Sequence, residues 1–221
     1  MKAGKLWVEG FILKINSEDK SNLPYINFLS DKRQELIHNY VFYGDKHRSL
    51  WSALLTKKIL EERSGIKLNE QKFIYNIYGK PQLANSNISF NISHSVNRIF
   101  LCCSNRTEVG VDVEKIEDAP LQIMDYLFHK NEIAYVLSGR TYEKNHRFYE
   151  IWTRKEAYAK CVGNGISEEL RNFDSKHEEV SNHFWTWEQD GYCFSIYLKD
   201  LLDVHISTVE QSELERFYTK L

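Results

Sequence analysis

The chain contains few of the residues that mark disordered, secreted or membrane-spanning proteins. It has three prolines and ten glycines among 221 residues and no low-complexity tract, so extended disorder is not expected. Its four cysteines follow neither zinc-site nor disulfide-framework spacing, which favours a reducing compartment. No apolar run approaches membrane-spanning length, and residues 1–15 are predicted to form a strand rather than a signal peptide. These absences predict a cytoplasmic protein with no membrane partner.

An excess of one charge is also missing. The chain carries 29 Lys and Arg against 31 Asp and Glu, a formal net charge of −2. Nonspecific nucleic-acid binding usually needs a large positive surface, so no nucleic-acid partner is expected and any anion site must be built locally. The remaining composition, with 42% hydrophobic and 27% charged residues, is that of an ordinary globular protein. The length allows one large domain or two small halves.

Hydrophobic periodicity predicts helices followed by strands in both parts of the chain. Strands are expected at 6–15, 73–77, 88–92, 99–103, 109–114, 184–198 with a hairpin turn at Asp190-Gly191, and 204–209. Helices are expected over 31–41 after Ser30, 50–64, 121–137 and 147–162, and from Ser212. A polar turn at Asn105 and Arg106 predicts that the strands beside it are antiparallel neighbours. The order indicates an α+β fold.

The first candidate site lies on the predicted strand 109–114. Side chains of a strand alternate between two faces, so three valines share one face while Gly110, Asp112 and Glu114 share the other. Two carboxylates on one face fit a metal site. The same alternation is common in a half-buried strand with one solvated face, and that interpretation is favoured when the pattern is taken alone.

Two helical segments offer further carboxylates. In 152–160, helical spacing places Trp152, Glu156 and Lys160 on one side. Glu156 followed four residues later by Lys160 is also an ordinary stabilising helix pair. The segment 127–132 offers Glu132, which alone would be an unremarkable surface residue.

Magnesium fits these carboxylates, because it prefers oxygen ligands and is commonly held by carboxylates, water and substrate phosphates. Asp112, Glu114 and Glu156 could form such a site, with Mn²⁺ as the alternative ion. Substrate phosphates would need donors nearby, and the candidates are Arg48, Lys80, Ser93, His94 and Lys160. Ordinary explanations stay open: Arg48 as a solvated helix residue, Lys80 as an exposed turn residue.

Six segments resemble the 4′-phosphopantetheinyl transferases of the surfactin-synthetase-activating (Sfp/Gsp) type. They are His47-Arg48-Ser49-Leu50, Tyr78-Gly79-Lys80-Pro81, Asn91-Ile92-Ser93-His94-Ser95, Val109-Gly110-Val111-Asp112-Val113-Glu114, 128–132, and 152–160 followed by Gly163-Asn164-Gly165. They span most of the chain and occur in the family's order. Each is weak alone, but six in order make a chance match improbable.

The resemblance implies a pseudo-twofold arrangement of two similar α+β halves, each with a small, mainly antiparallel sheet and packed helices, and an active-site cleft between them. Residues 1–106 would make most coenzyme A contacts, and 107–221 would hold the metal site and the carrier-protein docking surface. Asp112, Glu114 and Glu156 match the family's metal triad, and Lys160 matches a phosphate-contacting lysine. The other positions that match coenzyme A contacts are Lys32, Arg48, Lys80, Ser93 and His94.

Three positions depart from the family's pattern. Glu35 stands where a second basic residue for the coenzyme A 3′-phosphate is often found. His129 replaces a usual serine or threonine, and Asn164 replaces a frequent lysine. None belongs to the metal triad, so these departures bear on affinity rather than on reaction type.

The implied reaction transfers the 4′-phosphopantetheine arm of coenzyme A, the substrate, to a serine of an apo acyl or peptidyl carrier protein and releases 3′,5′-ADP. Mg²⁺ and Lys160 would stabilise the charge that grows on phosphoryl oxygens. The proton acceptor stays open among Glu156, Glu132 and a metal-bound water. The carrier's pathway also stays open among fatty-acid, polyketide and nonribosomal-peptide synthesis, although the family type favours antibiotic biosynthesis.

Two other functions remain alternatives. A magnesium-dependent nuclease or phosphatase would use similar carboxylates, but the balanced charge does not favour a nuclease. A noncatalytic coenzyme A-binding module should lack one metal carboxylate, and all three are present. Residues 121–128 are a candidate carrier dock, with an amphipathic helix core as the alternative. Two fused halves would complete the cleft without a partner subunit, so a monomer is expected.

Overall fold

The computed structural model describes residues 6–16, 23–163 and 168–221. Its strands are β1 (Val8–Lys14), β2 (Phe73–Tyr75), β3 (Pro81–Leu83), β4 (Ser89–Ser95), β5 (Arg98–Ser104), β6 (Val109–Lys115), β7 (Phe184–Gln189), β8 (Tyr192–Leu198) and β9 (His205–Glu210). Its α-helices are α1 (Asp31–Asn39), α2 (Tyr43–Ser64), α3 (Met124–Leu127), α4 (Lys130–Leu137), α5 (Thr141–Val162), α6 (Glu168–Asn172), α7 (Glu178–Ser181) and α8 (Gln211–Thr219). The short 3₁₀ helices are η1 (Ile26–Phe28) and η2 (Leu121–Ile123). Asn164 lies outside the described residues.

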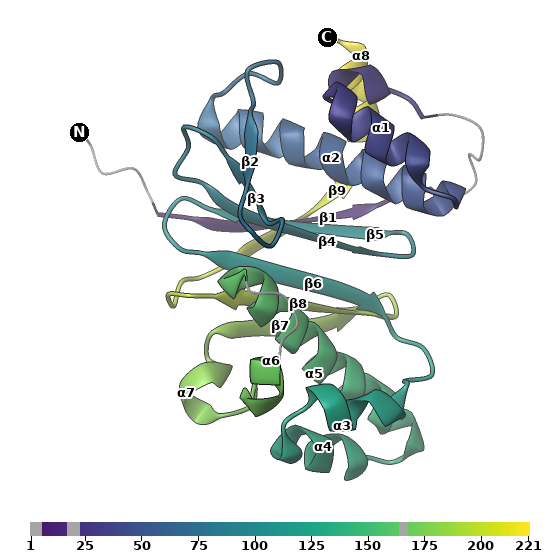
Figure 1. The fold of residues 1–221 in the computed structure, drawn as a ribbon, viewed down its shortest axis with the longest axis vertical. Helices are drawn as coiled ribbons and strands as arrows, with labels where there is room; N and C mark the ends of the chain where they lie inside the picture. The colour runs from purple at the N-terminus through teal and green to yellow at the C-terminus, as the bar shows by residue number, and fades with distance from the viewer. Residues whose placement is uncertain (1–5, 17–22, 164–167) are drawn as a thin grey trace.

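The described strands form three small sheets. One has the order β4-β5-β1-β9, a second the order β6-β8-β7, and β2 pairs with β3 as a hairpin. All pairs are antiparallel except β1 with β9. Helices α1, α2 and α8 lie on the outer side of the four-stranded sheet, and α5 lies on the outer side of the three-stranded one (Figure 1). The predicted α+β class, with small sheets and packed helices, is confirmed.

Three apolar clusters fill the spaces between these layers. The first lies between the four-stranded sheet and its helices, and the third joins α3, α4 and α5. The second lies between the two larger sheets and includes Phe100, Val111 and Phe194. Strand alternation explains how one strand serves two clusters, because Leu13 of β1 belongs to the first and Ile12 to the second.

The predicted pairing of β5 with β6 is wrong. The turn after β5 carries the chain from the four-stranded sheet to the three-stranded sheet, where β6 pairs with β8. The valine face of β6 instead packs against Phe100 and Cys102 of β5, across the second cluster. Alternation of side chains predicts which face of a strand is apolar. It does not predict what covers that face, because either a second sheet or a helix can bury it.

The end of the chain returns to the four-stranded sheet. β9 pairs in parallel with β1, and α8 packs against the first cluster through Leu214 and Tyr218. The Tyr218 hydroxyl donates to the Leu54 carbonyl at 2.7 Å. Residues 205–219, which were expected in the second half, therefore lie on the first sheet. Parallel pairing joins distant segments without a local turn, so the sequence carries no short-range signal for it.

Several predicted boundaries also shift. The helix expected over 121–137 divides into α3 and α4, because Phe128 is extended and His129 is the N-cap of α4. The strand expected over 73–77 ends at Tyr75, and the helix expected to reach residue 41 ends at residue 39. The hairpin turn at Asp190-Gly191 is confirmed, with φ angles of 52° and 77°, as its type requires. Among the described helices, none is both long and apolar enough to cross a membrane.

Candidate active site

A glycine brings helix α5 against strand β6. A Cβ atom on Gly110 would stand 2.0 Å from the carbonyl oxygen of Ala157 and 2.4 Å from the backbone nitrogen of Cys161. Only a residue without a side chain allows two backbones to approach this closely. As a result, the part of α5 that carries Glu156 and Lys160 lies directly over the carboxylate face of β6.

Strands β4 and β6 are edge strands of different sheets, and side chains join them in place of backbone pairs. The residues of β4 that make these contacts are Ser89, Asn91, Ser93 and Ser95. Asn91 Oδ1 accepts from the Val111 N–H at 2.9 Å, while the serines contact carboxylates of Glu108, Asp112 and Glu114. We call this set of contacts the β4–β6 seam. It holds the acidic side chains of β6, and that of Glu108 just before it, against β4.

Asp112 is the centre of the seam. Its side chain is 1% exposed. Its Oδ1 accepts from Lys160 Nζ at 2.6 Å and from Ser93 Oγ at 2.7 Å, whereas its buried Oδ2 has no hydrogen-bond partner among the described residues. The solvated strand face favoured by the isolated pattern is therefore wrong, since α5 covers this face. A buried carboxylate oxygen without a donor is costly unless a ligand supplies positive charge.

Glu114 and Glu156 share this environment. Burial, followed by the negative charge of Asp112, raises the pKa of Glu114 to about 7, and the same two causes raise the pKa of Glu156. Burial opposes the charge on Lys160, but its contacts with Asp112 outweigh this effect and raise the pKa of Lys160. Three neighbouring carboxylates with one ammonium group leave an excess of negative charge, which favours a cation.

The side chains of Asp112, Glu114 and Glu156 can be compared with what a magnesium site requires. Within the described ranges, no group of three or more His, Cys, Asp or Glu side chains is already arranged to hold a metal ion. Mg²⁺ nevertheless commonly binds only one or two carboxylates, with water and substrate phosphates as its other ligands. The free Oδ2 of Asp112, beside Glu114 and Glu156, fits that chemistry. The residues present fit a hard divalent cation, and the coordination itself stays a prediction.

A pocket of about 310 Å³ lies beside these groups. Its lining comes from the turn 78–80, from β4 and from the end of α5, and it includes Lys80, Asn91, Glu156 and Lys160. Lys80 Nζ donates to the Cys161 carbonyl at 2.9 Å, which fixes the turn after β2 to α5. The structure therefore brings three of the predicted site residues, Lys80, Glu156 and Lys160, to one pocket.

A second group of predicted residues gathers at the C-terminal end of β4. His94 keeps surface exposed to solvent, but the protein atoms packed around it desolvate it. This desolvation, followed by the positive charge of Arg48, lowers the pKa of His94, and Lys160 and Arg33 add to the effect. Arg48 forms an ion pair with Asp45 and donates from Nη1 to a backbone carbonyl of the β4–β5 turn at 3.1 Å. Converging cationic side chains of this kind suit phosphate groups.

Helix α1 carries two residues named from the sequence and one that was missed. Lys32 and Glu35 are exposed. Arg33 donates from Nη2 to the Ser49 carbonyl at 3.3 Å, and its Nε is buried without a hydrogen-bond partner in the described part of the chain. A single arginine on a polar helix gives no signal in the sequence. Its importance appears only when the fold places it near His94.

Glu132 forms a separate, buried ion pair with Lys155. It is 0% exposed, and its Oε2 pairs with Lys155 Nζ at 2.9 Å and accepts from the His129 N–H at 2.7 Å. Its Oε1 accepts from the Ser175 N–H and hydroxyl at 2.8 and 2.7 Å. A catalytic role for Glu132 would require this ion pair to open. His129 in turn caps α4 by accepting from the Asn131 N–H, the task that a serine or threonine usually performs.

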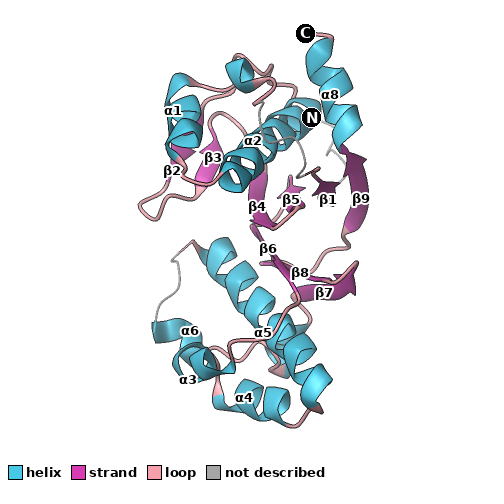
Figure 2. Ribbon diagram, turned by 90° about the vertical axis from the view of Figure 1, so that its right-hand side faces the viewer, coloured by secondary structure: helices cyan, strands magenta, loops and turns pink. Residues whose placement is uncertain are grey.

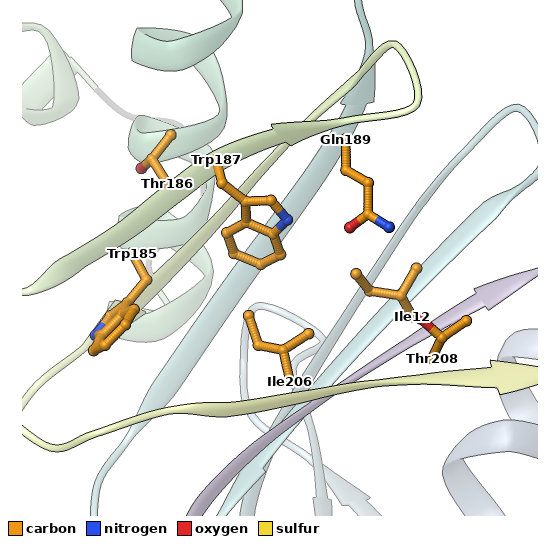
Figure 3. Close-up of a pocket in the computed structure, with 7 residues that line it drawn as sticks. All are labelled: Ile12, Trp185, Thr186, Trp187, Gln189, Ile206 and Thr208. Carbon is orange, nitrogen blue, oxygen red and sulfur yellow. The ribbon is translucent and has the colours of Figure 1, made fainter.

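A larger pocket, of about 430 Å³, lies at the opposite edge of the two sheets. It is lined by β7, β9 and Ile12, and Trp187 and Ile206 point into the space between the strands (Figure 3). Its lining contains no ionisable side chain. The carboxylates and phosphate-binding candidates all lie elsewhere, so size does not identify the active site.

Two family models match this chain in adjoining segments. Residues 108–210 match the 4′-phosphopantetheinyl transferase superfamily, and residues 17–106 match the 4′-phosphopantetheinyl transferase N-terminal family. The 4′-phosphopantetheinyl transferase gsp of Aneurinibacillus migulanus is 33% identical over 170 residues, which cover 75% of this chain and 70% of the relative. This chain belongs to the 4′-phosphopantetheinyl transferase superfamily.

Two relatives from Bacillus subtilis agree with this result. The 4′-phosphopantetheinyl transferase ffp is 31% identical over 156 residues, 70% of this chain and 69% of the relative. The 4′-phosphopantetheinyl transferase Sfp, from strain 168, is 28% identical over 155 residues, with the same two coverages. The predicted Sfp/Gsp type and enzyme class are confirmed, while the roles of individual residues in this transferase stay predictions.

Proposed function

We propose that this transferase moves the 4′-phosphopantetheine arm of coenzyme A to a serine of an apo acyl or peptidyl carrier protein and releases 3′,5′-ADP. The activity for which its relatives are named supports the reaction class. The observation that carries the proposal is the buried Asp112 carboxylate, with one oxygen held by Lys160 and the other without a donor. A magnesium ion and a diphosphate would provide the missing charge and ligands for such a group.

We infer that residues 1–106 and 107–221 act as two similar halves, with β9 and α8 of the second returning to the sheet of the first. We infer also that the pocket lined by Lys80 and Lys160 is the cleft between the halves. The proposed coenzyme A contacts are Lys32, Arg48, Lys80, Ser93, His94 and Lys160. Because one chain supplies both walls of this pocket, we propose a monomer. Four free cysteines fit a cytoplasmic location.

Asp112, Glu114 and Glu156 are the proposed ligands of Mg²⁺, with Mn²⁺ as the alternative. When bound, the ion would act as a Lewis acid toward the diphosphate oxygens. Lys160 is held by Asp112 and by Ser93, whose Oγ lies 3.0 Å from Nζ. It would keep a fixed positive charge beside the same oxygens, where negative charge grows as 3′,5′-ADP leaves.

Two carboxylates, Glu156 and Glu132, are the alternative proposed acceptors of the proton of the carrier serine. Glu156 lines the proposed substrate pocket. Glu132 would serve only after separation from Lys155. Position therefore favours Glu156, and the variant Glu132→Gln provides the comparison.

The carrier is proposed to dock over residues 121–128. Met124 and Phe128 are buried in the third cluster, so the helix-core alternative holds for these two residues. Tyr126 is 76% exposed, and Asp125 beside it is also exposed. Because exposed aromatic side chains are enriched in protein interfaces, Tyr126 is the proposed carrier contact.

Incubation with Mg²⁺, coenzyme A and an apo carrier, followed by intact-mass measurement, tests the proposal. Carriers from fatty-acid, polyketide and nonribosomal-peptide synthesis would be compared; transfer to the last two would support a role in antibiotic biosynthesis. We expect the carrier to gain one phosphopantetheine arm, and Asp112→Asn to lower the rate at least about 100-fold. A nuclease would instead degrade added DNA, and a binding module would hold coenzyme A unchanged. No arm on any carrier would contradict the proposal.

A further inference from the structure

We propose that Ser95 is a positioning residue, which orients the Glu114 carboxylate toward the divalent cation. The inference rests on the function proposed above and concerns a residue with no role assigned so far. It comes from a repeated geometry within the β4–β6 seam. Ser89 and Ser95 each accept from a β6 backbone N–H, but the carboxylates that they hold differ.

Each of three serines on β4 donates its hydroxyl hydrogen to the carboxylate nineteen residues later. Ser89 Oγ lies 3.1 Å from Glu108 Oε2, Ser93 Oγ 2.7 Å from Asp112 Oδ1, and Ser95 Oγ 2.8 Å from Glu114 Oε2. The repeat arises because β4 and β6 run side by side and every second residue of each faces the other strand.

Each hydroxyl oxygen also accepts a hydrogen bond, from Lys160 Nζ at Ser93 and from a β6 backbone N–H at the other two serines. Ser89 accepts from the Val109 N–H at 3.3 Å, and Ser95 accepts from the Lys115 N–H at 3.2 Å. A serine hydroxyl has one hydrogen and two lone pairs. When the backbone N–H occupies a lone pair, the hydroxyl hydrogen is directed away from it, toward the carboxylate. Ser95 therefore works as an oriented donor whose direction the backbone of β6 sets.

The three contacts differ in what else holds the carboxylate. Asp112 Oδ1 has a second donor in Lys160, and Glu108 interacts with Lys80 at the exposed end of the seam. Glu114 accepts from no other group among the hydrogen bonds of the described residues. Its other oxygen thus stays available for a ligand, while the longer glutamate side chain depends on Ser95 alone for its orientation. Loss of that contact would release side-chain rotation that a bound ion must then restrict.

The substitution Ser95→Ala, with Ser89→Ala as its matched control, tests this inference. Both variants remove one serine hydroxyl and leave one β6 amide without its acceptor, so their effects on stability should be similar. Binding of Mn²⁺ alone to the purified protein would be followed by electron paramagnetic resonance. We expect Ser95→Ala to weaken Mn²⁺ binding about 10-fold or more and Ser89→Ala to change it less than about twofold.

Two further measurements separate positioning from a general loss of structure. Ser95→Thr keeps a hydroxyl and should restore most of the Mn²⁺ affinity. In the transfer assay at saturating coenzyme A, Ser95→Ala should raise the Mg²⁺ concentration needed for half-maximal rate more than it lowers the maximal rate. Thermal unfolding of each variant reports how much stability was lost.

The outcomes distinguish this inference from the proposed function. If the unmodified protein transfers the arm and binds Mn²⁺, but Ser95→Ala matches Ser89→Ala in both metal measurements, the role of Ser95 is wrong and the proposed function stands. If the unmodified protein neither binds Mn²⁺ nor modifies a carrier, both are overturned.

Discussion

The two larger sheets approach each other at two edges, and these edges are built in opposite ways. At one edge, β4 and β6 are joined by the serine and asparagine side chains of the seam. At the other, no hydrogen bond between described residues joins β7 to β9, and the larger pocket separates them. The sheets lie close together at β4 and β6 and diverge toward β7 and β9 (Figure 2).

The difference shows where chemistry is placed in this fold. The closed edge is polar, and almost every group in it has a partner, so the unpartnered Oδ2 of Asp112 marks a place for a ligand. The open edge buries apolar surface of Trp187 and Ile206 against the second cluster. We expect changes at the closed edge to alter both transfer and stability, and changes at the open edge to alter stability alone.

Gly110→Ala should have the largest effect. The new Cβ would stand 2.0 Å from the Ala157 carbonyl oxygen, and neither backbone can move without separating α5 from β6. We expect the free energy of unfolding to fall by more than about 4 kcal/mol, measured by urea denaturation, and transfer to be lost. In the control Gly10→Ala, the Cβ would meet side chains rather than backbone, with Phe100 at 3.2 Å and Ile206 at 3.4 Å. Equal losses of unfolding free energy in the two variants would show that the close approach of the α5 backbone to Gly110 does not cause the destabilisation.

Trp187→Ala should have the next largest effect and tests the open edge. The Trp187 ring stacks on Phe194 with centroids 5.2 Å apart and meets Phe100 edge-on at 5.6 Å. Removing the ring should lower the free energy of unfolding by about 3 kcal/mol. Transfer per folded molecule, assayed well below the unfolding temperature, should stay unchanged. A fall in kcat/KM at that temperature would mean that the open edge also takes part in function.

Asn91→Leu should have a smaller effect, at the closed edge. The leucine side chain is similar in size but cannot accept the hydrogen bond of the Val111 N–H, which would remain buried without a partner. We expect the free energy of unfolding to fall by about 1 to 3 kcal/mol, with a parallel fall in transfer because Asn91 lines the proposed cleft. Replacement of another amide side chain by leucine at an exposed position of the open edge, Gln189→Leu, provides the control and should alter neither quantity.

Trp185→Ala should have the smallest effect. Trp185 lines the larger pocket but is 39% exposed, in contrast to its neighbour Trp187 two residues later on the same strand. We expect a change in the free energy of unfolding of about 0.5 kcal/mol and normal transfer. A loss as large as that of Trp187→Ala would show that the rim of the open edge contributes as much as its interior.

Part of this contrast could be predicted from the sequence. Alternation predicted β4 and β6 and the shared face of Asp112 and Glu114, and the six ordered segments identified the family. Periodicity reports which face of an element is apolar, but not which element covers it. The pairing of β6 with β8, the cover of α5 over Gly110 and the return of β9 to β1 were therefore not predicted.

The candidate site was likewise predictable only in part. Charged residues in familiar order named Asp112, Glu156 and Lys160 as candidates. The roles of Ser95 and Asn91 depend on the register between two strands in different sheets, and no local pattern encodes that register. Arg33 was missed for a related reason, because its contact with Ser49 links two helices.

The parallel pairing of β1 with β9 also sets an order of events during synthesis. β1 must wait for β9, which is synthesised much later, before this edge of its sheet is complete. Until then, β1 keeps an open edge that invites association with other strands. Cutting the chain between its two parts would leave the same defect permanently, so the first part should not be obtained as a stable fragment.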